Sequence, residues 1–309
     1  MSDPEAWPKL PLSDWAGTCG TLHRWTQIVG KVRMALTPLV NHWWNVTFYV
    51  TSRGLSTSSI SYGSRSFDID FDFLDHRLFI KASDGSTEVL ALKSGSVADF
   101  YREFIERLSR LGIEVHIWTM PSEIENAIPF DKDVAEAEYD PIWAQRFFQV
   151  LRQSDRLLKD FRAGFIGKVS PVHFFWGGFD MAVTRFSGRT APPPAGKIPN
   201  VAQWVMAEAY SHEVSSCGFW PGNGGYGKAA FYAYAYPEPR SFSEVALRTA
   251  EGYYDHDLGQ FLLPYDAVRQ AADPDALLLG FLQETYEAAA NRAHWNRDAL
   301  ERRFTAPIS

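Results

Sequence analysis

Two stretches of this 309-residue chain carry the same landmarks in the same order. Each stretch has a histidine followed by aromatic residues, then a Val-Thr tract, and closes with a segment of helical periodicity. The matching segments are 40–44 with 171–176, 50–57 with 183–190, 67–73 with 210–216, and 100–108 with 281–289. We therefore expect an internal duplication, in which two repeats of a helix–antiparallel sheet–helix unit pack as one body.

The hydrophobic pattern between these landmarks predicts an α+β fold. Residues 66–73 (SFDIDFDF) alternate strictly, which is typical of a strand with one buried face. Aromatic residues make up 15% of the chain, and they favour sheets and large cores. The expected helices cover residues 20–37, 96–111, 141–166, 200–209 and 274–292. The expected strands cover residues 42–52, 66–73, 77–82, 87–92, 113–119, 172–186, 210–217, 229–236 and 260–264.

The same reading divides the chain into five segments. Prolines at positions 8 and 11 predict an irregular N-terminal arm, and the acidic, proline-containing stretch after position 120 predicts a linker. The predicted segments are an arm (1–18), a first repeat (19–120), a linker (121–139), a second repeat with long loops (140–295) and a C-terminal tail (296–309).

Composition excludes several classes of protein. The formal net charge of −7 and the lack of a basic stripe argue against nucleic-acid binding. Two cysteines cannot form a disulfide framework, and no CxxC pair is present. Neither a secretory signal nor an apolar run of about 18 residues is found, so we expect no membrane partner and a cytoplasmic location. No cofactor is required by the sequence, and the oligomeric state is not indicated.

The two repeats differ in one strand. Phe67, Ile69, Phe71 and Phe73 form one side of the first repeat's strand, whereas the matching positions of the second repeat are occupied by smaller or polar residues. Those positions are Tyr210, His212, Val214 and Ser216. If this side faces the core, the second repeat contains either a compensating segment or a cavity.

The leading functional hypothesis is that this cavity binds a small polar or aromatic molecule. His173 and His212 are the candidates for acid–base catalysis, because imidazole titrates near neutral pH. A Gly-rich loop, 218–227, could close over the ligand, although it lacks the features of a phosphate-binding loop. The candidate ligand-binding residues are Trp176, Arg185, Tyr210, Ser216, Trp220 and Tyr234.

Two alternatives remain open. The first is a metal-dependent enzyme that uses His42, His173 and His212, although no HxH or HExxH spacing supports it. The second is a non-enzymatic interaction module that uses the arm and the long loops. The alternating Asp68, Asp70 and Asp72 are interpreted as a solvated strand face rather than a cation site.

The motifs VNHWW, FDIDFDFLDHRL, SPVHFFWG, VTRFSG, YSHEVSS, GFWPG and FYAYAYPEP together resemble a bacterial family of domains of unknown function. The resemblance covers residues 7–295, and it implies no activity, cofactor or catalytic residue.

Overall fold

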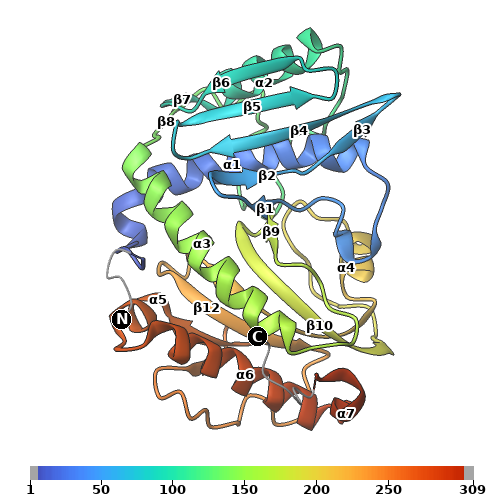
Figure 1. Cartoon of the computed structure of the whole chain (residues 1–309), viewed down its shortest axis with the longest axis vertical. Coiled ribbons are helices and arrows are strands. Elements are labelled where there is room, and N and C mark those ends of the chain that lie inside the picture. Colours follow the sequence, from blue (N-terminus) through green and yellow to red (C-terminus); the bar gives the residue numbers. More distant parts are fainter. Residues whose placement is uncertain (1–5, 303–309) are drawn as a thin grey trace.

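The computed structural model describes residues 6–302. Two six-stranded antiparallel sheets lie one above the other along the long axis of the molecule (Figure 1). Helix α1 (Leu12–Leu36) runs beneath the first sheet, and α3 (Pro141–Ala163) crosses from the first sheet toward the second. The α+β class is therefore confirmed.

The first sheet is built around the alternating strand, β4 (Arg65–Asp72). Phe67, Ile69, Phe71 and Phe73 are all buried, as the alternation predicts. The strand order is β1-β2-β4-β5-β6, and β3 also pairs with β4. The other strands are β1 (Tyr49–Val50), β2 (Gly54–Ser56), β3 (Ile60–Tyr62), β5 (Arg77–Ala82) and β6 (Thr87–Ala91).

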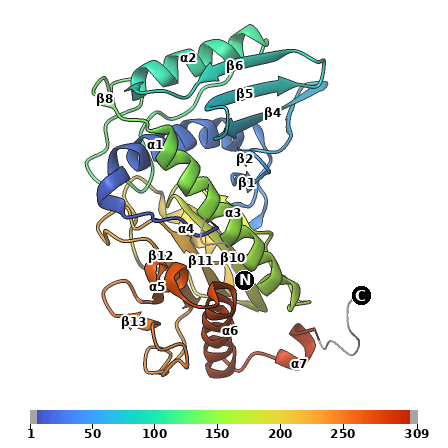
Figure 2. The ribbon, with the colours of Figure 1, turned by 60° about the vertical axis from the view of Figure 1, so that its left-hand side comes forward.

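Helix α2 (Val97–Arg110) covers the outer side of this sheet (Figure 2). Ser96 caps it by accepting a hydrogen bond from the Asp99 amide, as expected of an N-cap serine. The short strands β7 (Gly95–Ser96) and β8 (Glu136–Ala137) pair with each other and tie the predicted linker to the start of this helix.

The second sheet has the order β13-β14-β12-β11-β10-β9. Its strands are β9 (His173–Phe175), β10 (Asp180–Thr190), β11 (His212–Trp220), β12 (Ala230–Tyr236), β13 (Tyr253–Asp255) and β14 (Gln260–Pro264). Helices α3 and α6 (Pro274–Arg292) pack against one of its faces. The smaller elements are η1 (Asn41–Trp43), α4 (Gln203–Ala209), α5 (Tyr265–Gln270) and α7 (Arg297–Leu300).

A single bridge joins the edges of the two sheets. Phe48, next to β1, and Phe174 in β9 exchange two backbone hydrogen bonds of 2.9 Å each. Both rings are buried, at 0% and 1% exposure, in the core that the two sheets share.

Several local predictions are wrong. Helix α1 begins at Leu12, so part of the predicted arm is helical, and Trp7 and Trp15 are buried. The start of the arm (1–5) and the end of the predicted tail (303–309) lie outside the described residues. Residues 42–48 form a turn of 3₁₀ helix and irregular backbone, with His42 at a φ of 58°, and only Tyr49–Val50 is a strand. Residues 113–119 are not a strand.

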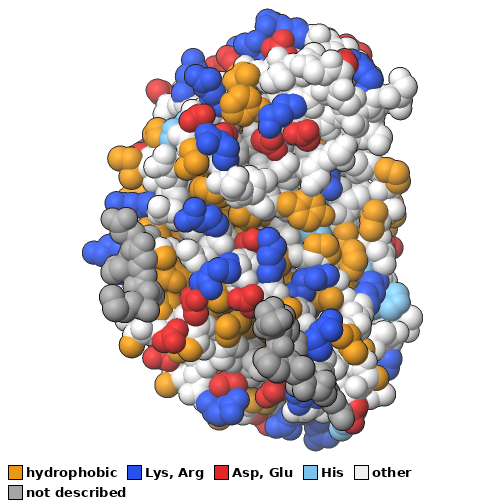
Figure 3. Space-filling model, in the orientation of Figure 1, with side chains coloured by type: hydrophobic (Ala, Val, Ile, Leu, Met, Phe, Trp, Pro, Cys, Tyr) orange, Lys and Arg blue, Asp and Glu red, His pale blue; other side chains and the backbone are white. Residues whose placement is uncertain are grey.

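The predicted duplication is not shown by the structure, because the two sheets differ in strand order. None of the helices within residues 6–302 has the length and apolar character needed to cross a membrane. On the face seen in Figure 3, acidic and basic side chains are interspersed rather than gathered by sign.

Candidate functional site

The two faces of the second sheet have different chemistry. Cys217, Phe219 and Phe231 face α3 and α6 and belong to the main hydrophobic core. Val214 and Ser216 lie on the opposite face, so the expectation that they point to the main core is wrong. This second face, which we call the tyrosine face, carries Asp180, Ala182, Thr184, Ser216, Gly218, Trp220, Tyr232 and Tyr234.

Small residues in β10 and β11 allow the tyrosines of β12 to lie across the sheet. Gly218 stands opposite Tyr232 on one side and Ala182 on the other. A β-carbon at Gly218 would sit 2.8 Å from the Tyr232 hydroxyl oxygen, so glycine is needed there. The Tyr232 hydroxyl thereby reaches past β11 and donates a hydrogen bond to the carboxylate of Asp180 in β10.

A second tyrosine pair lies beside the first. The rings of Tyr232 and Tyr234 stack with centroids 6.1 Å apart, and the Tyr234 hydroxyl lies 3.1 Å from that of Tyr210. Tyr210 follows α4, at the end of a proline-rich segment (191–209) that is also held to Tyr236, whose hydroxyl donates to the Pro192 carbonyl. The tyrosine face thus carries a row of hydroxyl groups next to a carboxylate.

Glu123, from the segment between the two sheets, completes this cluster. Its amide donates to the Pro199 carbonyl oxygen at 2.8 Å. Its carboxylate lies over the turn between β9 and β10, where Gly177 and Gly178 leave room for it. The position of a β-carbon on Gly178 would be 3.6 Å from Glu123 Oε2 and 2.8 Å from Asp180 Oδ1, so both carboxyl groups lie beside this glycine.

The surroundings disfavour ionisation of both carboxyl groups. Desolvation of its carboxyl group, together with the charge of Asp180, raises the pKa of Glu123 to about 7, although the residue as a whole is exposed and solvent screening reduces this shift. Burial raises the pKa of Asp180 to about 6, against the opposing effect of the Tyr232 hydrogen bond. Burial also raises the pKa of Tyr232 well above 10, so its hydroxyl stays a neutral donor.

Helix α1 holds the backbone that carries Glu123. The buried Gln27 side chain donates to the Ser122 carbonyl and accepts from the Ser122 amide, both at 2.8 Å. Lys31 donates to the Met120 carbonyl at 2.8 Å, and His23 Nε2 donates to the Gly177 carbonyl at 2.7 Å. Three side chains of one helix therefore position both walls of the carboxyl cluster.

His173 lies on the tyrosine face, in register with Ala182. Its ring is 1% exposed, and its Nε2 lies 3.4 Å from the hydroxyl of Tyr49. Burial, with the charges of Arg33 and Arg162, lowers the pKa of His173 to about 3. This lowering of the pKa disfavours the protonated imidazole that a general acid needs near neutral pH.

His42 and His212 lie together at the far end of the same face, with ring centroids 5.7 Å apart. His42 Nε2 accepts a 2.7 Å hydrogen bond from Lys168, and His212 Nδ1 lies 3.1 Å from the Ser211 hydroxyl. His173 instead contacts Trp44, Tyr49 and Phe175. Within residues 6–302, no three His, Cys, Asp or Glu side chains are grouped so that they could hold a metal ion.

Two candidate ligand-binding residues are separated from the others. Arg185 faces the helices, where its guanidinium lies 3.5 Å from the ring centroid of Phe161 and 4.2 Å from that of Tyr286. Trp176 is buried against Gly30, and its indole donates to the Val46 carbonyl at 2.8 Å. The candidates Tyr210, Ser216, Trp220 and Tyr234 do lie on or beside the tyrosine face.

Sequence reasoning did not select Glu123 or Asp180. Asp180 follows a Gly-Gly pair at a strand start, and such a pair signals a close approach by other groups. Glu123 had no comparable signal, because its partner comes from a distant part of the chain.

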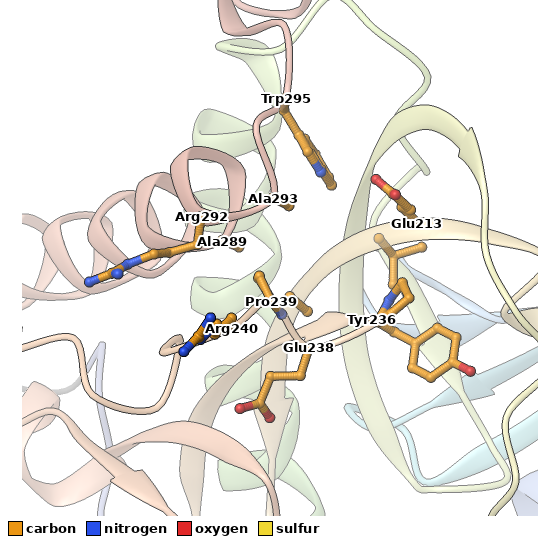
Figure 4. A pocket seen from close by; sticks show the side chains of 12 residues that line it. Glu213, Tyr236, Glu238, Pro239, Arg240, Ala289, Arg292, Ala293 and Trp295 are labelled. Atoms are coloured by element: carbon orange, nitrogen blue, oxygen red, sulfur yellow. The ribbon is translucent and has the colours of Figure 1, made fainter.

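A separate pocket of about 210 Å³ opens beyond the Tyr236 end of β12, next to the last turn of α6 (Figure 4). Its acidic groups already have partners. Glu213 pairs with Arg189 at 2.6 Å, and Glu238 accepts from the Tyr254 hydroxyl at 2.5 Å. The carboxyl groups of this pocket are therefore paired, unlike those of the tyrosine face.

These features define an α+β protein with two antiparallel sheets and a carboxyl–tyrosine cluster on the second. The chain belongs to a family of unknown function (DUF5996), whose model matches residues 7–302 and confirms the resemblance seen in the motifs. No curated protein and no solved structure matches the chain significantly.

Proposed function

We propose that the protein binds a small polar, ring-bearing molecule against the tyrosine face and that Glu123 and Asp180 act on it as general acid and base. The position of both carboxyl groups beside Gly178, with the charge of Asp180 acting on Glu123, carries the proposal. Two carboxyl groups that share one site resist joint ionisation, so one keeps a proton near neutral pH while the other accepts one.

The rest of the tyrosine face supports a ring-bearing ligand. Trp220 stacks on Tyr226 with centroids 5.5 Å apart, and both rings are partly accessible. Such aromatic surfaces favour contact with the face of a ring, while nearby hydroxyl groups orient its polar substituents. This proposal places the acid–base role on the carboxyl pair, while the role predicted from the sequence for His173 and His212 stays a prediction.

Binding can be tested with p-nitrophenol and methyl glucoside as probes, on protein with ¹³C-labelled tyrosine rings. Saturable shifts of the Tyr232 and Tyr234 resonances are expected with at least one probe. Glu123→Gln and Asp180→Asn should weaken the response, whereas Glu125→Gln, on the same segment but not against the Gly177–Gly178 turn, should not. Tyrosine signals that stay unchanged with both probes would refute the binding site.

Catalysis can be tested separately with p-nitrophenyl acetate and p-nitrophenyl glucoside. General acid–base catalysis contributes about 10²–10⁴-fold, so E123Q should lose roughly 100-fold or more of any turnover. Turnover in E123Q and D180N equal to that in E125Q would show that the carboxyl pair is not catalytic.

A further inference from the structure

We propose that Arg33, Tyr49 and His173 form a binding site for a small oxyanion, either a carboxylate or a phosphate group. This site is distinct from the carboxyl cluster and uses neither Glu123 nor Asp180. It lies where the last turn of α1 meets β1 and β9, the edge strands of the two sheets.

Arg33 is a buried cation without a counter-ion. Its side chain is 7% exposed, and no carboxylate within residues 6–302 forms an ion pair with it. Its Nη1 donates to the Thr47 carbonyl, but its Nε–H has no acceptor. A buried charge of this kind is costly unless an opposite charge compensates it.

Arg185 is a second buried arginine of this structure, and aromatic rings compensate its charge without a ligand. Its guanidinium lies 3.5 Å and 4.2 Å from the centroids of two rings, Phe161 and Tyr286. Arg33 has a single such neighbour, Tyr49, at 5.5 Å. The negative end of α1 offsets only part of the Arg33 charge, since a helix terminus carries about half an elementary charge.

His173 supplies a second donor without an acceptor. The Tyr49 hydroxyl, 3.4 Å from Nε2, can donate to that nitrogen, which leaves the proton of the neutral imidazole on Nδ1. Nδ1 is buried and has no hydrogen-bond partner. Buried polar groups are normally satisfied, so an unpaired Nδ1–H and an unpaired Arg33 Nε–H, on two residues that both contact Tyr49, indicate a missing acceptor.

The charges around His173 are also positive. Both Arg33 and Arg162 act on its imidazole electrostatically, and no carboxylate opposes them. Tyr49 and Trp44, which contact His173, are partly exposed, so an anion could reach the donors beside these rings. An oxyanion would accept from both unpaired groups and neutralise the Arg33 charge.

The test is a titration of the purified full chain with sodium phosphate, sodium acetate or sodium chloride at matched ionic strength. The imidazole NMR signals of His173 report the binding, and thermal unfolding provides a second readout. A saturable shift with phosphate alone would identify a phosphate ligand, and a shift with acetate as well would identify a carboxylate ligand. Chloride should give neither.

Variants make the assignment specific. Because a charge-assisted hydrogen bond contributes about 1.5–3 kcal/mol, Arg33→Gln should weaken binding by about tenfold or more. Tyr49→Phe should weaken it less, and Arg24→Gln, a partly exposed arginine on the same helix, should leave it unchanged. If R33Q does not fold, the oxyanion titrations of the wild type and of Y49F decide whether the site exists. No saturable shift with either oxyanion, or equal affinity in wild type, R33Q and Y49F, would overturn the proposal.

Discussion

Tyr232 and Asp180 are hydrogen-bonded to each other from strands that are not neighbours. The tyrosine stands in β12 and the aspartate in β10, and β11 separates them. The contact exists because Gly218 has no side chain, so the phenol ring of Tyr232 can lie across the middle strand. It places a neutral donor on a carboxylate that burial would otherwise drive further toward its protonated form.

Tyr232→Phe should therefore raise the pKa of Asp180 above its value of about 6, because the hydrogen bond that favours the ionised form is lost. A ¹³C carboxyl NMR titration of the folded protein measures this directly. Tyr226→Phe is the matched control, since the Tyr226 hydroxyl shares a hydrogen bond with that of Tyr253 and, within residues 6–302, with no carboxyl group. An unchanged or lower Asp180 pKa in Y232F would show that the hydrogen bond does not stabilise the carboxylate.

Gly218→Ala should destabilise the second sheet. The added β-carbon would lie 1.8 Å from the Met181 carbonyl oxygen, so the backbone of β10 or β11 must move. Overpacking of this kind costs about 1–3 kcal/mol of unfolding free energy, and denaturant unfolding measures it. Gly95→Ala, a strand position with no atom within 4 Å of the added carbon, should cost much less. Equal losses in the two variants would contradict this explanation.

Strong local periodicity made the helices and the longer strands predictable. The alternation in residues 67–73 identifies both the strand and its buried side, because each second residue is a bulky apolar one. In β11 both faces carry polar as well as apolar side chains. Val214 and Ser216 lie on one face, and Ser215 and Cys217 lie on the other. The pattern there cannot say which face meets the helices, and the predicted core side was the wrong one.

The site itself depends on contacts that local pattern does not encode. Glu123 comes to Asp180 because Gln27 binds the backbone of Ser122, 95 residues away in sequence. His42 and His173 match in sequence, yet one lies in a 3₁₀ turn and the other in a strand. Tertiary packing decides where these groups lie. The local sequence pattern therefore pointed to the histidines and gave no indication of the carboxyl groups.

The unfolding free energy should show a pH dependence that Glu123 causes. Its pKa rises from 4.5 in the unfolded chain to about 7 in the folded one, so the folded state binds the additional proton. Stability from this group is therefore present below pH 4.5 and is lost as the pH rises through about 7. The loss is smaller than the shift alone implies, because Glu123 is an exposed residue and solvent screens its charge.

Subtracting the wild-type curve from that of Glu123→Gln isolates this effect. The difference is needed because His23 and His173, whose pKa values are lowered to about 4 and about 3, give the opposite slope at acidic pH. The amide variant should gain stability relative to wild type as the pH rises from 5 to 8. A flat difference curve would mean that Glu123 titrates at its ordinary pKa.

Gln27→Met tests whether α1 positions the carboxyl cluster. Methionine fills a similar volume but leaves the amide and carbonyl of Ser122 without their partners, and unsatisfied groups cost about 1–3 kcal/mol. The released segment should let the Glu123 carboxyl group move away from Asp180, so its pKa should fall toward 4.5, as followed by ¹³C carboxyl NMR. Gln153→Met is the control, because Gln153 bonds only to Arg156 of its own helix. A Q27M protein that loses stability but keeps the raised Glu123 pKa would show that Gln27 supports the fold without positioning the carboxyl group.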